Sequence, residues 1–408
     1  MKLTFAGVGI SSLGGGLFLP VGLLYLIHVL GIPVSQAGLM MTGATTISLV
    51  ATSVAGRMVD RVGARVVVVA SRVLQAAGCL VLLASTGPVL ACVALLLLGL
   101  GLRSFWASIF ALTGALAGQQ QGPPKDEVFA KLAVVESLGT AAGGLGAVVC
   151  LVVAGSHGTG IYRGVLAANA ALTVVAAVLI MYGARKVTPL PVTEGEGQAW
   201  HTVFRDTAFL RFLSVNIPMA LAVSLMAVAI PVFTVDSLGL APWVPAAIFA
   251  TVTITSAVFR VSVIRSRAGK SCTRTLQLAA IAVTVWGVLQ YLVTLVPGPW
   301  QMVLLVVGLA FYVTGEIVHG PTLNALTDLV APAAHTGAYL ATLQYTFGVS
   351  DVLAPLFVTA LGFSAGLPWL GFALLGALAA LLLPLAAGRL LRPGLPSTTD
   401  RPTAPATR

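Results

Sequence analysis

Charged residues are scarce in this sequence. Only 8% of its 408 residues are charged, 58% are hydrophobic, and the mean hydropathy is +1.01. Soluble globular domains carry about 25% charged residues, and a soluble chain of this size has too little interior to bury so much apolar surface. The composition therefore excludes a water-soluble enzyme and predicts an all-α polytopic membrane protein.

Residues that build catalytic and metal sites are also few. The chain has four cysteines and five histidines, and no two cysteines form a CxxC pair. Cys79, Cys92 and Cys150 lie inside apolar runs, where cysteine acts as a small hydrophobic residue. No catalytic constellation and no phosphate-binding G-x-x-x-x-G-K-S/T motif is present. We expect no enzyme activity, no metal, no cofactor and no ATP hydrolysis.

Long hydrophobic runs, by contrast, fill the chain. A helix needs about 20 predominantly apolar residues to cross a bilayer. Membrane helices tolerate proline, so we expect helices to continue through prolines such as Pro20 and Pro355. Twelve runs reach the required length, at residues 4–30, 36–56, 66–86, 89–115, 129–154, 162–184, 209–235, 242–264, 274–296, 300–326, 336–362 and 366–390.

Basic residues set the orientation of these runs. With a cytoplasmic N-terminus, all but three of the 22 Lys and Arg residues lie on the cytoplasmic side, and the exceptions are Arg163 outside and Arg72 and Arg103 within runs. Topology thus accounts for the net charge of +10, and we expect no nucleic-acid partner. Both termini are predicted to be cytoplasmic, in the plasma membrane.

A polar stretch divides the runs six plus six. Residues 185–208 hold a Pro/Gly/Glu-rich linker followed by AWHTVFRDTAFLRFL, which predicts a helix at the membrane interface. We expect one six-helix bundle over 1–184, a second over 209–391, and a disordered cytoplasmic tail over 392–408.

The two halves also share weak sequence similarity. At an offset of 206, Arg61 and Gly63 fall on Arg267 and Gly269. This match, together with the division of the runs, predicts two pseudo-symmetric bundles. Transporters built from two such halves bind substrate near the membrane midplane, between the halves.

With these features the sequence resembles the major facilitator superfamily. The loop signature of that family is roughly G-x-x-x-D-R-x-G-R-R, and GRMVDRVGAR matches it in the loop after the second run. The stretch VGLAFYVTGEIVHGPTLNALTDLVAPAAHTGAYLA resembles the tenth and eleventh spans of drug-efflux members. Arg103 matches an intramembrane arginine of the family's fourth span, although Trp106 and Ala107 replace the Gln and Gly that usually follow.

The resemblance implies a conformational latch in this loop. In the family the Asp packs against the start of the eleventh span when the cytoplasmic side is closed, and a helix N-terminus stabilises a carboxylate by about 0.3–1 kcal/mol. Two glycines suit the corners of a tight loop. The alternative is that these charges only fix topology. The predicted latch residues are Gly56, Asp60, Arg61, Gly63 and Arg65.

Charges within membrane helices are costly and mark functional sites. Arg103 and Glu136 lie at similar predicted depths in neighbouring runs, and we expect them to form an ion pair that is either structural or coupled to substrate or protons. Glu316 and His319, three residues apart on one helix face, form a second candidate proton site.

Asp351 is a third candidate for proton or cation binding, with Gln344 on the same face. His28 and Asp236 lie near the outer ends of their runs, where we expect solvated or capping roles. Pockets for small molecules are mostly apolar, and the candidate lining residues are Phe18, Tyr25, Phe105, Trp106, Gln344 and Tyr345.

The resemblance implies an alternating-access transporter. We expect a monomer whose partners are a small-molecule substrate, protons and the lipid bilayer. The branch that it indicates exports amphipathic drugs or metabolites by proton antiport. Two alternatives stay open: a symporter or facilitator for sugars or organic acids, and a non-transporting membrane receptor or partner protein.

Overall fold

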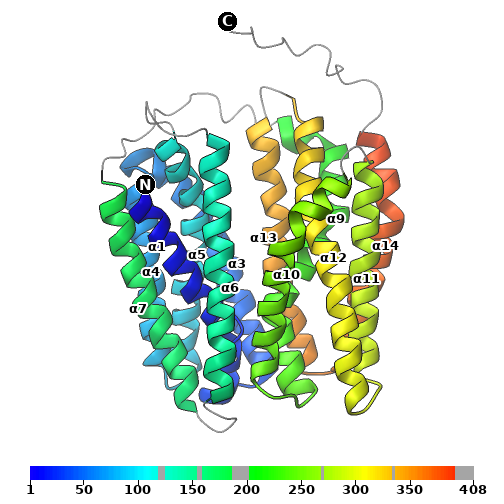
Figure 1. Ribbon diagram of the computed structural model, residues 1–408, viewed down its shortest axis with the longest axis horizontal. Coiled ribbons are helices and arrows are strands. Elements are labelled where there is room, and N and C mark those ends of the chain that lie inside the picture. Colours follow the sequence, from blue (N-terminus) through cyan, green and yellow to red (C-terminus); the bar gives the residue numbers. More distant parts are fainter. Residues whose placement is uncertain (118–124, 154–158, 186–201, 268–270, 333–335, 391–408) are drawn as a thin grey trace, which may run out of the picture.

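The computed structural model describes residues 1–117, 125–153, 159–185, 202–267, 271–332 and 336–390, and the regular elements in these ranges are helices. Figure 1 shows two groups of helices side by side, one from each half of the chain. The first group comprises α1 (Lys2–Phe18), α2 (Gly22–Leu24), the π-helical η1 (Tyr25–Val29), α3 (Val34–Val62), α4 (Ala64–Leu83), α5 (Pro88–Ala117), α6 (Lys125–Val153) and α7 (Thr159–Gly183).

The second group repeats this plan. It comprises α9 (Thr207–Val232), the π-helical η2 (Phe233–Ser237), α10 (Trp243–Arg267), α11 (Cys272–Val293), α12 (Pro299–Val330), α13 (Thr336–Leu361) and α14 (Leu367–Leu390).

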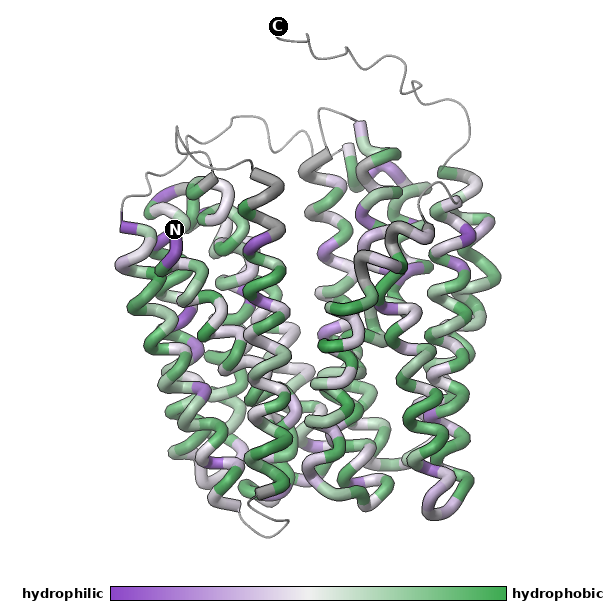
Figure 2. The backbone as a smooth tube through the Cα atoms, in the orientation of Figure 1, coloured by the Kyte–Doolittle hydropathy of each residue, from purple (hydrophilic) through white to green (hydrophobic). Residues whose placement is uncertain are grey.

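Hydrophobic residues follow one another along most of the helix length (Figure 2). Among the described residues, nine helices are long and apolar enough to cross a membrane, and the bent pair of α1 with α2 and η1 makes a tenth. Large side chains such as Val258, Leu381 and Leu385 stay more than 60% exposed, as expected of surfaces that face lipid. The chain is a multi-pass membrane protein. Helices cover each of the twelve predicted runs, and a count of twelve spans stays a prediction.

The first predicted run is not one continuous helix. α1 ends at Phe18 and α2 starts at Gly22, with a bend of 49° between them. Pro20 lies at the break, because proline has no N–H to donate and its ring crowds the preceding turn. The expectation that a helix continues through Pro20 is therefore wrong, whereas α13 does continue through Pro355.

The predicted loop between the second and third runs is a single-residue turn. α3 continues through Gly56 to Val62 and α4 begins at Ala64, so Gly63 alone turns the chain. Its φ of 86° is a conformation that glycine adopts without a Cβ clash. The expectation that Gly56 forms a loop corner is wrong. The side chain of Asp60 lies outside the described residues, so the latch stays a prediction.

The start of α9 is tied to α13. Asp206 caps α9 by accepting a hydrogen bond from the backbone N–H of Phe209 at 2.9 Å, and its other carboxylate oxygen accepts one from the Tyr339 hydroxyl at 2.9 Å. Residues 202–205 are also helical. Linker residues 186–201 and the tail from 391 lie outside the described residues, so the interfacial helix and the disordered tail stay predictions.

Glycines bring α1 and α6 into close contact. A Cβ at Gly143 would overlap the carbonyl oxygen of Leu13, and one at Gly16 would overlap that of Thr140. Small residues allow membrane helices to approach in this way. Gly15, one position from Gly16, has no atom within 4 Å of where its Cβ would lie.

The two halves meet through α3 with α13 and through α6 with α10. One end of the bundle carries the start of α1, the start of α9 and the turn at Gly63, and we call it the linker end (Figure 1). The opposite end, with the turns at Gly31 and Gly239, is the far end. There a Cβ at Gly38 of α3 would lie 2.6 Å from the Pro355 carbonyl oxygen of α13.

The glycine contact yields a stability prediction. We expect Gly143→Ala to lower the free energy of unfolding by about 1–3 kcal/mol, because the methyl group overpacks the α1–α6 contact. Gly15→Ala is the matched control, and we expect no change there. Thermal unfolding of the purified protein in detergent measures both, and equal melting temperatures for the two variants would show that this contact is not tight.

Candidate functional site

A cavity of about 550 Å³ lies between the two halves near the middle of the helices. Its walls come from α1, α2, η1, α3, α4, α5, α6 and α7 of the first half and from α9 and α13 of the second. Most of the lining is apolar, but four ionisable side chains reach it, namely Arg72, Arg103, Glu136 and Asp351. Because charges at membrane depth are costly, this convergence marks the cavity as the candidate site.

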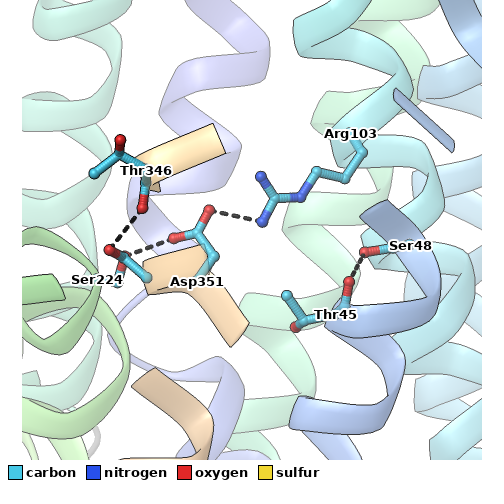
Figure 3. A network of polar contacts seen from close by, with 7 residues as sticks. Thr45, Ser48, Arg103, Ser224, Thr346 and Asp351 are labelled. Carbon is cyan, nitrogen blue, oxygen red and sulfur yellow. Dashed lines mark hydrogen bonds and ion pairs between the residues drawn. The ribbon is translucent and has the colours of Figure 1, made fainter. Parts of the chain in front are cut away.

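An ion pair crosses the cavity from one half to the other. Arg103 on α5 donates from Nη2 to Oδ2 of Asp351 on α13 at 2.7 Å, and Ser224 on α9 donates to Oδ1 at 2.6 Å. Figure 3 shows Arg103 and Asp351 extending toward each other from separate helices. Within the cavity, this pair is a polar side-chain contact that joins the two halves.

Arg103 therefore does not form the predicted ion pair with Glu136. Its partner is Asp351, which lies 248 residues away in the sequence. The cation that acts electrostatically on Glu136 is Arg72 of α4. Depth along single helices was the basis of the prediction, and depth does not determine which helices face one another.

Arg72 is held in the wall of the cavity by neighbours of the first half. Its Nη1 donates to Oε1 of Gln75 at 2.6 Å, and its guanidinium carbon lies 3.3 Å from the centre of the Phe105 ring. A guanidinium over an aromatic face is a cation–π contact. Sequence reasoning noted Arg72 as an intramembrane charge but gave it no role, and it did not consider Gln75 or Ser224.

Half of the predicted lining residues reach the cavity. Phe18, Phe105 and Trp106 line it. Tyr25 instead is buried, and its hydroxyl donates to the Leu82 carbonyl at 3.3 Å. The expectation that Gln344 and Tyr345 line the cavity is wrong, because both are exposed on α13 and neither belongs to its walls.

Glu316 and His319 lie on α12, outside the cavity walls. Glu316 accepts a hydrogen bond from Ser256 at 2.6 Å. His319 is buried, and among the described residues its Nε2 has no hydrogen-bond partner. The two residues are thus separated from the Arg103–Asp351 pair, and a proton site there stays a prediction.

A second contact between the halves lies at the far end. His28 of η1 and Asp236 of η2 contact each other at 2.9 Å while both stay partly exposed, so the expected solvated position comes with a pairing that the sequence analysis did not predict. The two residues are 208 positions apart, and Gly31 and Gly239 follow at the same spacing with φ of 65° and 67°. The repeated Leu-Gly dipeptides at 30–31 and 238–239 are the sequence signal of this symmetry.

Comparison with known proteins identifies the family of this chain. Residues 4–355 match the sequence model of the Major Facilitator Superfamily. The chain belongs to the major facilitator superfamily. This membership makes it a secondary transporter. A search of curated proteins gave no significant match.

Solved structures of this superfamily's fold resemble the chain over nearly its whole length. A nucleoside transporter, NupG, has a TM-score of 0.72 at 13% identity, with 96% of this chain and all of that chain covered. A POT family transporter in complex with a thioalcohol-conjugated peptide has a TM-score of 0.76 at 13% identity, with 96% of both chains covered. An auto-inhibited POT family peptide transporter has a TM-score of 0.75 at 12% identity, with 98% of both covered. At these identities the likeness concerns the fold alone.

The His28–Asp236 pair yields a prediction about conformation. Both side chains are partly exposed, and such pairs contribute about 0.2–1 kcal/mol. We therefore expect His28→Gln to increase opening of the far end by roughly twofold to fivefold. The readout is labelling of Ala227→Cys, in the cavity wall, by a membrane-impermeant maleimide from the far side, with the four native cysteines replaced.

The control for this experiment is Ser237→Ala, which alters the same π-helical segment without touching the ion pair. Unchanged labelling in His28→Gln would mean that the pair does not hold the far end closed.

Proposed function

We propose that this superfamily member is a proton-coupled exporter of small amphipathic molecules. It acts as a monomer in the plasma membrane by alternating access, with the linker end in the cytoplasm. The Arg103–Asp351 ion pair carries the proposal, because it joins the two moving halves inside the cavity at membrane depth. The drug-efflux resemblance of the tenth and eleventh spans and the largely apolar wall support this substrate class and direction.

Protonation of Asp351 supplies the coupling. A charge-assisted hydrogen bond is roughly twice as strong as a neutral one, so a proton on the carboxylate weakens its hold on Arg103. The Arg103 side chain is 19% exposed and that of Asp351 is 38% exposed. Asp351 is therefore open to protons and substrate that enter the cavity. Loading and release of the proton alternately loosens and restores the tie between the halves.

A second candidate function is proton symport of an organic acid. Two arginines in the cavity favour it, since an anionic substrate and a proton can occupy the site together. The two functions differ in the relative direction of flux. In export by antiport, protons and substrate move in opposite directions across the membrane, whereas in symport they move in the same direction. Flux of either kind excludes a non-transporting receptor.

Asp351→Asn tests the coupling. We expect proton-driven transport to fall by about tenfold or more, because hydrogen bonds to charged groups are worth about 1.5–3 kcal/mol and asparagine cannot exchange a proton. Exchange of substrate across the membrane without a pH gradient should persist. Proteoliposomes with an imposed pH gradient, an internal pH dye and a panel of labelled amphipathic compounds provide the measurement.

Glu316→Gln is the matched control, because Glu316 lies outside the cavity walls. If Asp351→Asn keeps full proton-driven transport and Glu316→Gln loses it, the proposed role of Asp351 is contradicted. The proton site would then lie at Glu316 on α12.

A further inference from the structure

Arg72 differs from Arg103 in that no described carboxylate lies within salt-bridge distance of it. Arg103 is engaged by Asp351, whereas among the described residues Arg72 forms no salt bridge. Glu136 interacts with Arg72 electrostatically but forms no salt bridge with it. Arg72 is therefore the cavity arginine that no described carboxylate holds directly, and a bound anion would share its charge with Glu136.

Two donors beside each other in this wall also lack acceptors. Arg72 and Gln75 are 6% and 9% exposed as whole residues, and among the described residues Nε of Arg72 and Nε2 of Gln75 have no hydrogen-bond partner. Buried donors without partners are rare in folded proteins and call for an explanation. The two donor atoms themselves are covered in this structure, but both residues line the cavity. A small side-chain shift on ligand binding would bring the donors to acceptors of the bound molecule.

Aromatic rings define the surroundings of these donors. Phe105 covers one face of the guanidinium, and Trp106 packs edge-on against Phe105 with ring centres 5.6 Å apart. A guanidinium stacked on a ring keeps its in-plane N–H groups available for a planar acceptor. Trp106 and Phe18 also line the cavity.

We propose that Arg72 and Gln75 form a carboxylate-binding subsite for the substrate, whose aromatic or apolar body lies against Phe105 and Trp106. The substrates are then amphipathic weak acids. This inference rests on the proposed function in that it takes the cavity as the substrate site. It assigns substrate recognition to α4, separate from the Arg103–Asp351 coupling pair.

The test uses two probes of the same shape, 2-naphthoate and its neutral amide, 2-naphthamide. Binding to the full-length protein in lipid nanodiscs is measured by equilibrium dialysis. We expect wild type to bind naphthoate more tightly than naphthamide, and Arg72→Met to lose about tenfold or more in naphthoate affinity, as expected for a hydrogen bond to a charged group. Naphthamide affinity should be unchanged in that variant, which also shows that it is folded.

Further variants separate recognition from structure. Arg72→Lys keeps the charge but loses the planar fork, so we expect an intermediate loss for naphthoate. Gln75→Leu should weaken naphthoate binding by a smaller factor than Arg72→Met. Arg163→Met removes an exposed arginine of α7 outside the cavity walls and should leave both affinities unchanged.

Two results would overturn the subsite: wild-type protein that binds naphthoate no better than naphthamide, or Arg72→Met that binds naphthoate as wild type does. The result is distinguishable from a failure of the proposed function. Charge-selective binding through Arg72 without proton-coupled flux contradicts the transport proposal and supports the subsite. Coupled flux without charge-selective binding supports the transport proposal and contradicts the subsite.

Discussion

The ion pair between Arg103 and Asp351 is the constraint on which the rest of the cavity depends. It joins α5 of one half to α13 of the other, and Ser224 of α9 fixes the second carboxylate oxygen. A single unpaired charge is costly at membrane depth, so each half supplies the counter-charge for the charged residue of the other. A contact of this kind is strongest while both groups are ionised, so a proton or a competing charged substrate weakens it.

The surrounding packing restricts where movement occurs. Within the first half, Gly143 and Gly16 allow α1 and α6 to pack backbone to backbone, which favours a rigid body. Between the halves, the described contacts at the far end include Gly38 against α13 and the His28–Asp236 pair. The first is a close backbone approach and the second is a polar side-chain pair. The halves thus pack along α3 with α13 and α6 with α10, and the two polar pairs add specific side-chain contacts across the same boundary.

Sequence reasoning found the helices because a run of 20 apolar residues has few other folded states. It missed features that depend on a local exception or on distant neighbours. Pro20 breaks a helix while Pro355 does not, and composition does not distinguish them. Asp351 and Arg103 were both recognised as intramembrane charges, yet their pairing depends on how α5 faces α13. Arg72 was visible as a buried charge, but only the ring of Phe105 and the unpartnered donor of Gln75 gave it a role.

A double-mutant cycle on the ion pair tests the central claim most directly. Spin labels at Tyr182→Cys and Ser266→Cys, in helices of opposite halves near the linker end, report the populations of the closed and open states. The measurement compares wild type, Arg103→Gln, Asp351→Asn and the double variant. If the pair ties the halves, the two effects are non-additive by about 0.5–3 kcal/mol. Additive effects would show that Arg103 and Asp351 act independently, and would contradict the account.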